Sequence, residues 1–185
     1  MTNRTQRTKR DIHLIFWQEL KEKPIEKITV KEICEKAMIN RTTFYLYYSS
    51  IYDLFEEIQN NILNTIDELS ITILSGQMDK YEVMEYILRS IDNNREYLKI
   101  LLIRDIDNRL WEAIIAKLEL LFKQSINTKY LKGIDEKQLN DTIQFLTYGY
   151  YGIYRNYIMN GNKGEIPYIA RYLIKATDAC FEGLM

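Results

Sequence analysis

The side chains with the clearest chemical potential cluster in the segment RTTFYLY, which begins at Arg41. The Arg41 guanidinium can bind guanine edges or a phosphate, and the hydroxyls of Thr42 and Thr43 can hydrogen-bond bases or phosphates. The threonine methyls can touch thymine methyl groups, and the hydroxyls of Tyr45 and Tyr47 can reach phosphates. These residue types, presented together, are suited to the noncovalent binding of nucleic acid.

A short helix is predicted to begin immediately after Thr29. The segment TVKE is a capping box, in which the Thr29 hydroxyl accepts from the backbone N–H of Glu32 and the Glu32 side chain reaches back. Apolar residues then recur at helical spacing, which predicts one buried face. This face comprises Val30, Ile33, Cys34 and Ala37.

A second short helix is predicted from Arg41 to about Tyr47, with Asn40 as its N-cap and Phe44 as its inward anchor. Two short helices joined by a turn of about three residues are typical of a helix-turn-helix. The outer face of the second helix is then free to enter a major groove. We expect that face to carry Arg41, Thr42, Thr43, Tyr45, Leu46 and Tyr47.

The remainder of the chain also has helical periodicity, which predicts an all-α fold of about nine helices. A first helix is predicted from about Thr8 to Lys23, and Pro24 ends it. A fourth helix is predicted to begin after Ser50, which forms a second capping-box pattern with Asp53. The later helices are predicted at about 81–91, 97–103, 109–126, 135–159 and 168–181.

From about residue 12 to residue 58 the sequence resembles TetR-type transcriptional regulators. The segments ITVKEI from Ile28 and AMINRTTFY from Ala37 carry the resemblance. Met38 stands where that family usually has Gly or a small residue, so we expect a turn that holds it without a positive φ. Ile51 stands where the family commonly has a Lys that contacts phosphate. The residues that support the match on either side are Phe16, Leu20, Tyr48, Ser50 and Leu54.

The resemblance implies a helix-turn-helix DNA-binding domain over 1–49 and a helical regulatory and dimerisation domain over 50–185. It implies a homodimeric repressor that binds a palindromic double-stranded DNA operator. An unidentified small-molecule effector would release the repressor from that operator. Thr29 would anchor a phosphate through its hydroxyl and its helix N-terminus. Further basic side chains are expected near the DNA, namely Lys27, Lys31, Arg4, Arg7, Lys9 and Arg10.

Two further sets of residues are predicted in the C-terminal part. An aromatic-rich effector pocket is predicted from Met84, Ile87, Tyr97, Trp111, Phe145, Tyr148 and Tyr151, and ordinary helix core with exposed tyrosines is the alternative. By resemblance, the last two helices form the dimer interface, and packing within one protomer is the alternative. The interface residues are Phe145, Tyr148, Gly152, Ile169, Tyr172, Ala176 and Phe181.

Charge is distributed unevenly along the chain, whose formal net charge is −1. Residues 1–50 contain ten basic and six acidic side chains, a net charge of +4, and the remainder has a net charge of −5. A basic N-terminal third is consistent with a DNA-binding region on an acidic body.

Several other classes are disfavoured by the sequence. His13 is the single histidine and has no metal-ligand or catalytic partners at suitable spacing, so we expect neither an enzyme nor a cofactor. Cys34 and Cys180 are predicted to be buried free thiols. No apolar run is long enough to span a membrane, and we expect a cytoplasmic protein with no membrane partner. The main alternative function is a TetR-like co-activator that acts through a protein partner without binding DNA. A purely structural helical dimer is a third.

Overall fold

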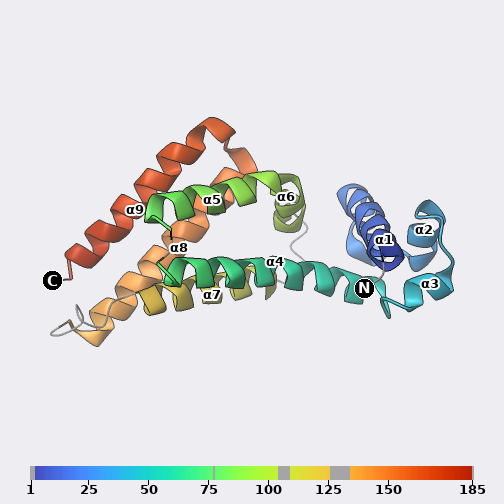
Figure 1. The fold of residues 1–185 in the computed structure, drawn as a ribbon, viewed down its shortest axis with the longest axis horizontal. Coiled ribbons are helices and arrows are strands. Elements are labelled where there is room, and N and C mark those ends of the chain that lie inside the picture. Colours follow the sequence, from blue (N-terminus) through green and yellow to red (C-terminus); the bar gives the residue numbers. More distant parts are fainter. Residues whose placement is uncertain (1–2, 77, 104–108, 126–133, 185) are drawn as a thin grey trace. The chain divides into compact units, whose positions relative to one another are not determined.

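The computed structural model describes residues 3–76, 78–103, 109–125 and 134–184, apart from the side chains of Asn3, Arg4 and Lys163. Within these ranges the chain forms nine α-helices and no strand (Figure 1), which confirms the all-α prediction. The helices are α1 Asn3–Glu22, α2 Val30–Lys36, α3 Arg41–Tyr45, α4 Ile51–Leu74, α5 Lys80–Asn93, α6 Arg95–Ile103, α7 Arg109–Ser125, α8 Glu136–Asn160 and α9 Ile166–Glu182.

The described residues divide into two compact units. The first, called the head below, consists of residues 3–62 and 100–103. The second, called the body, consists of the described residues from 63 to 99 and from 109 onward.

Two helix boundaries in the head differ from those predicted. Helix α1 begins at Asn3 rather than near Thr8, because the polar stretch NRTQRT contains neither Gly nor Pro to prevent helix formation. Helix α3 ends at Tyr45 rather than near Tyr47. Its C-cap residue Leu46 keeps α-region dihedrals and donates its N–H to the Thr42 carbonyl, so the chain turns there without further helix.

Large apolar side chains of α1, α3 and α4 form the core of the head. Phe16, Phe44 and Leu54 are completely buried. The Phe16 ring lies 6.0 Å from the Phe55 ring, and the Phe44 ring lies 5.5 Å from the Tyr48 ring, measured between centroids. The first contact joins α1 to α4, and the second packs Tyr48 on the α3 anchor Phe44. The complete burial of Phe44 indicates that the short α3 is held by packing rather than by its own helix propensity.

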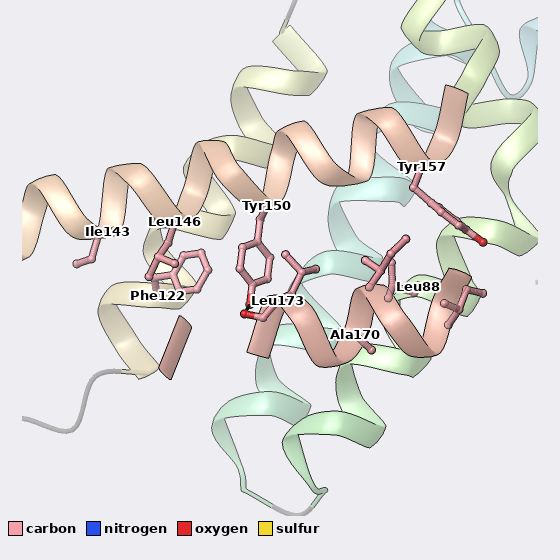
Figure 2. Close-up of a cluster of buried hydrophobic side chains, with 10 residues drawn as sticks. Leu88, Phe122, Ile143, Leu146, Tyr150, Tyr157, Ala170 and Leu173 are labelled. Atoms are coloured by element: carbon pink, nitrogen blue, oxygen red, sulfur yellow. Dashed lines mark hydrogen bonds between the residues drawn. The ribbon is translucent and has the colours of Figure 1, made fainter. Parts of the chain in front are cut away.

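The core of the body lies between α8 and its neighbours α5, α7 and α9. Figure 2 shows Ile143, Leu146 and Tyr150 projecting from α8 toward Phe122 of α7 and Leu173 of α9. The Phe122 and Tyr150 rings meet edge-on, with centroids 5.1 Å apart. Burial of apolar side chains such as these is the main favourable term in folding.

Three tyrosines on the inner face of α8 each use their hydroxyl within the body. Tyr150 bonds Thr177 Oγ1 at 2.7 Å and donates to the Leu173 carbonyl at 3.2 Å, both on α9. Tyr154 donates to Met84 Sδ at 3.3 Å and Tyr157 to Asp92 Oδ1 at 3.1 Å, both on α5. Burial raises the pKa of Tyr150 to about 12 and, with the Asp92 bond, that of Tyr157 to about 12.

The two cysteines are free thiols, as predicted, but only Cys34 is buried. Cys180 is half-buried, because it lies in the last turn of α9, close to the end of the body's core. Among the described helices, none has an apolar stretch long enough to cross a bilayer.

Candidate nucleic-acid interface

The start of α2 is closed by the predicted capping box. Glu32 donates its backbone N–H to Thr29 Oγ1 at 3.3 Å, and Glu32 Oε2 accepts from the Thr29 backbone N–H at 3.0 Å. Glu32 Oε2 also accepts from the Thr29 hydroxyl at 2.8 Å. The Thr29 hydroxyl proton is therefore used within the chain, and a phosphate would have to compete with Glu32 for it.

Four charged side chains join α1 to α2 around this cap. Lys23 donates to Glu32 Oε1 at 2.8 Å and lies 3.0 Å from Glu19 Oε2, and Lys36 also bonds Glu19. The Glu19 carboxylate is buried, so the two lysines provide the partners that a buried charge requires. Bonds from Lys23 and then Thr29 lower the pKa of Glu32 to about 2.

Replacing Glu32 by glutamine is expected to remove part of the acid sensitivity of folding. The folded pKa of Glu32, about 2, lies below the ordinary value of 4.5, so its charge stabilises the fold above pH 4.5. That contribution is lost as the pH falls from 4.5 toward 2. Urea unfolding should therefore show a stability gap between wild type and Glu32→Gln at pH 7 that narrows below pH 4.5. A gap independent of pH would contradict this origin.

The turn after α2 contains the one positive φ among the described non-glycine residues. Met38 has φ 53°, so the prediction of a turn without positive φ was wrong. The Met38 N–H bonds the Glu35 carbonyl at 3.3 Å, and the Ile39 N–H bonds the Cys34 carbonyl at 3.0 Å. This pair of bonds is the Schellman motif, which requires a left-handed residue at this position whichever side chain occupies it.

Replacing Met38 by glycine is expected to stabilise the head by about 0.5–1 kcal/mol, since glycine adopts the left-handed region without a Cβ penalty. The Met38 side chain is 91% exposed, so its removal costs no core packing. Urea unfolding of Met38→Gly against wild type measures the gain. Met38→Ala is the matched control, because it also removes the exposed side chain but keeps the Cβ. An equal gain from alanine would refute the backbone explanation.

Helix α3 presents most of the predicted contact residues to solvent. Phe44 faces inward, while Arg41, Thr42, Tyr45 and Leu46 are exposed, with Tyr45 at 56% and Leu46 at 77%. Thr43 and Tyr47 are half-buried. Asn40 occupies the N-cap position, but its side chain makes no cap hydrogen bond. The two short helices, the closed turn and the exposed outer face together have the geometry of a helix-turn-helix.

Residues 17–58 match the family described as bacterial regulatory proteins, tetR family. A protein of Bacillus subtilis (strain 168), "Uncharacterized HTH-type transcriptional regulator YxbF", is 25% identical over 114 residues, which cover 58% of this chain and 30% of that protein. Residues 17–58 therefore carry the sequence signature of the tetR-family helix-turn-helix. The fold of the chain is also similar to the solved structure of "Dihydroxyacetone kinase operon activator DhaS", with TM-score 0.65 and 18% identity over 96% of this chain and 97% of that one.

The basic side chains of the head differ in how far they are already paired. Arg7, Arg10 and Lys27 are exposed. Lys31 lies 3.8 Å from Glu35 in an exposed pair, which contributes little. Lys9 donates to Glu57 Oε2 at 2.6 Å and lies over the Tyr48 ring, so its charge is largely neutralised within the head. The Arg4 side chain lies outside the described residues.

Sequence reasoning missed a polar cluster that ties the end of the motif to α1 and α4. The buried Tyr48 donates its hydroxyl to Glu57 Oε1 at 2.8 Å and lies 2.9 Å from His13 Nε2. Burial lowers the pKa of His13, although Glu57 opposes this shift, and burial and the Glu57 bond hold the pKa of Tyr48 above its usual range. Tyr48 was matched only as an apolar position, because its partners lie 35 and 9 residues away.

The side chains of Ser50 and Asp53 accept hydrogen bonds from backbone N–H groups at the start of α4. Asp53 donates its N–H to Ser50 Oγ at 3.1 Å, as the second predicted capping box requires, but its carboxylate accepts from the Ser49 N–H at 2.7 Å rather than from Ser50. Ile51 is buried at 6% exposure. The position at which the TetR-type pattern commonly has a phosphate-contacting Lys is here part of the core of the head.

The residues predicted to line a pocket range from buried to exposed in the body. Trp111 is buried with its ring centroid 6.0 Å from that of Tyr151, and Met84 accepts from Tyr154. Ile87 and Tyr97 are half-buried, whereas Phe145 is 70% exposed and Tyr148 54% exposed. The body has a hollow of ≈ 540 Å³ between α8 and α9 and another of ≈ 300 Å³ between α4 and α5. Of the seven predicted residues, only Phe145 lines either of them.

The residues predicted at the dimer interface include an exposed stripe on α8. Phe145, Tyr148 and Gly152 follow helical spacing, and each is exposed in the protomer. On α9, Tyr172 is 51% exposed, and Ala176 and Phe181 are half-buried. Ile169 is 8% exposed and belongs to the body's own core, because it lies on the face of α9 that packs inward. Across the described residues, no three His, Cys, Asp or Glu side chains gather as a metal site would require.

Proposed function

We propose that this protein is a sequence-specific DNA-binding repressor of the TetR type that acts as a homodimer on a palindromic operator. In this proposal residues 1–49 bind DNA and residues 50–185 dimerise and bind a small-molecule effector. The observation that carries it is the helix-turn-helix itself, in which α3 is anchored by Phe44 and presents Arg41, Thr42, Tyr45 and Leu46 to solvent. Those side chains can read base edges while nearby basic residues hold phosphates.

The effector would act through the separation of the two heads. A dimer reads two half-sites that lie about 34 Å apart or a multiple of this, so a change of a few Å prevents simultaneous contact. An effector that binds more tightly to the conformation with the non-matching head separation shifts the population toward that conformation. The dimer then leaves the operator.

A co-activator that works through a protein partner is the second candidate. Two observations favour it: the structurally similar protein DhaS is named an operon activator, and Ile51 is buried where a phosphate-contacting cation is common in the family. The DNA-binding function is better supported. The exposed face of α3 carries Arg41, Thr42 and Tyr45, whose side chains are suited to binding DNA.

The test is binding of the purified full chain to the DNA upstream of its own gene, compared with random duplex of equal length at ~100 mM salt. Wild type should prefer the upstream DNA, and Arg41→Ala and Tyr47→Ala should weaken binding. Arg89→Ala is the control, because Arg89 is an exposed arginine of α5 that pairs with Glu85 in the body. The logarithm of affinity should fall with the logarithm of salt by about 0.9 per phosphate contact.

Two results would reject the repressor proposal. One is equal binding to upstream and random DNA, since electrostatic attraction alone does not discriminate sequence. The other is a flat salt dependence, which would favour the co-activator that binds a protein partner.

A further inference from the structure

The helix-turn-helix of the head exposes two large apolar side chains, Leu46 and Met38. Leu46 is 77% exposed and Met38 is 91% exposed, and neither side chain has a hydrogen-bond donor. Arg41 is the one charged residue between positions 38 and 48. Leu46 and Met38 cannot read base edges through hydrogen bonds, whereas Arg41, Thr42 and Tyr45 beside them can.

The exposed side chains share one side of the motif. Thr42 and Leu46 are four residues apart, as are Arg41 and Tyr45, so each pair lies on neighbouring positions of the α3 surface. The Tyr45 ring meets the buried Phe44 ring edge-on, with centroids 5.7 Å apart. The Thr42 methyl and the Leu46 side chain therefore form an apolar strip beside Arg41, on a backbone that Phe44 holds in place.

The major groove presents one kind of apolar group to such a strip, the 5-methyl group of thymine. Polar edges of guanine, cytosine and adenine would lose hydration against Leu46 without gaining a hydrogen bond in return. Arg41, next to the strip, supplies the attraction to phosphate or guanine that the apolar side chains lack.

We propose that Leu46 and Thr42 are specificity-determining residues that read thymine methyl groups, so that each operator half-site carries thymine opposite them. This inference rests on the proposed DNA-binding function. It assigns Leu46 a reading role that is independent of hydrogen bonding, and it makes Arg41 the anchor beside it.

The experiment first selects the preferred duplex from a random library with the full-length wild-type protein. Each thymine of that duplex is then replaced, one at a time, by deoxyuridine, which removes only the 5-methyl group. At one or more positions in each half-site, affinity should fall about fourfold, the effect of one buried methyl. With Leu46→Ala the uridine duplex and the thymine duplex should bind equally at the position that Leu46 contacts.

Leu120→Ala is the matched control, since Leu120 is a 53% exposed leucine on α7 in the body, and this variant should retain the wild-type response to deoxyuridine. Specific binding with no response to deoxyuridine at any position would overturn the inference while leaving the proposed function intact. Unchanged operator binding by Leu46→Ala would also overturn it. Failure to select any preferred duplex would instead reject the DNA-binding function on which the inference rests.

Discussion

Replacing Gly152 by leucine is expected to abolish the proposed dimer while leaving the protomer folded. A Cβ added at Gly152 meets no atom within 4 Å, and glycine inside a helix is less favourable than leucine by about 1 kcal/mol. The protomer therefore has no reason to lose stability. In a dimer that packs the α8 stripe against a second copy, the new side chain would hold the two helices apart.

Light scattering measures the mass, which should fall to that of the 22.2 kDa protomer. Operator affinity should fall by about 10² or more, because the second head no longer binds as part of one molecule. Ala116→Leu is the matched control, since it places an exposed leucine on α7 instead. A Gly152→Leu protein that keeps the dimer mass would exclude α8 from the interface.

The second large effect is expected at Phe44. Its side chain is completely buried against Tyr48, so truncation to alanine removes a large apolar group and leaves a cavity. Such changes cost about 3–5 kcal/mol, which is a large part of the stability of a typical domain. Since Phe44 also holds α3, operator binding should be lost together with the folded head.

Trp17 lies in the head and Trp111 in the body, so a Trp111→Phe background makes fluorescence a reporter of head unfolding during a urea titration. The control is Tyr45→Ala, a neighbouring aromatic that is 56% exposed. It should weaken operator binding but cost much less stability than Phe44→Ala. Equal losses from both variants would show that Phe44 does not anchor the helix.

Local sequence patterns predicted the parts of the head that depend on neighbouring residues. The capping box of Thr29 and Glu32 was found from a spacing of three residues, and its bonds are present as expected. The inward position of Phe44 followed from helical periodicity, because one face of a helix repeats every three to four residues. The family signature then placed both helices in one motif.

Other features escaped because their causes are not local. The left-handed Met38 is imposed by the two backbone bonds that close α2, which outweigh the preference of a residue with a Cβ. The ion pair of Lys9 with Glu57 was not predicted, because it joins positions 48 residues apart. Phe145 and Tyr148 were assigned to both a pocket and an interface, because aromatic content alone does not tell inner from outer faces of α8.

The three inner tyrosines of α8 have a consequence for how the body can respond to any signal. Each hydroxyl has its partner at a different height along the neighbouring helices: Tyr150 on α9, and Tyr154 and Tyr157 on α5. A slide of α8 by one turn would leave all of these buried hydroxyls without their acceptors at once. Helices α5, α8 and α9 are thus fixed in register, and a conformational signal that passes through the body must displace them together as a rigid block.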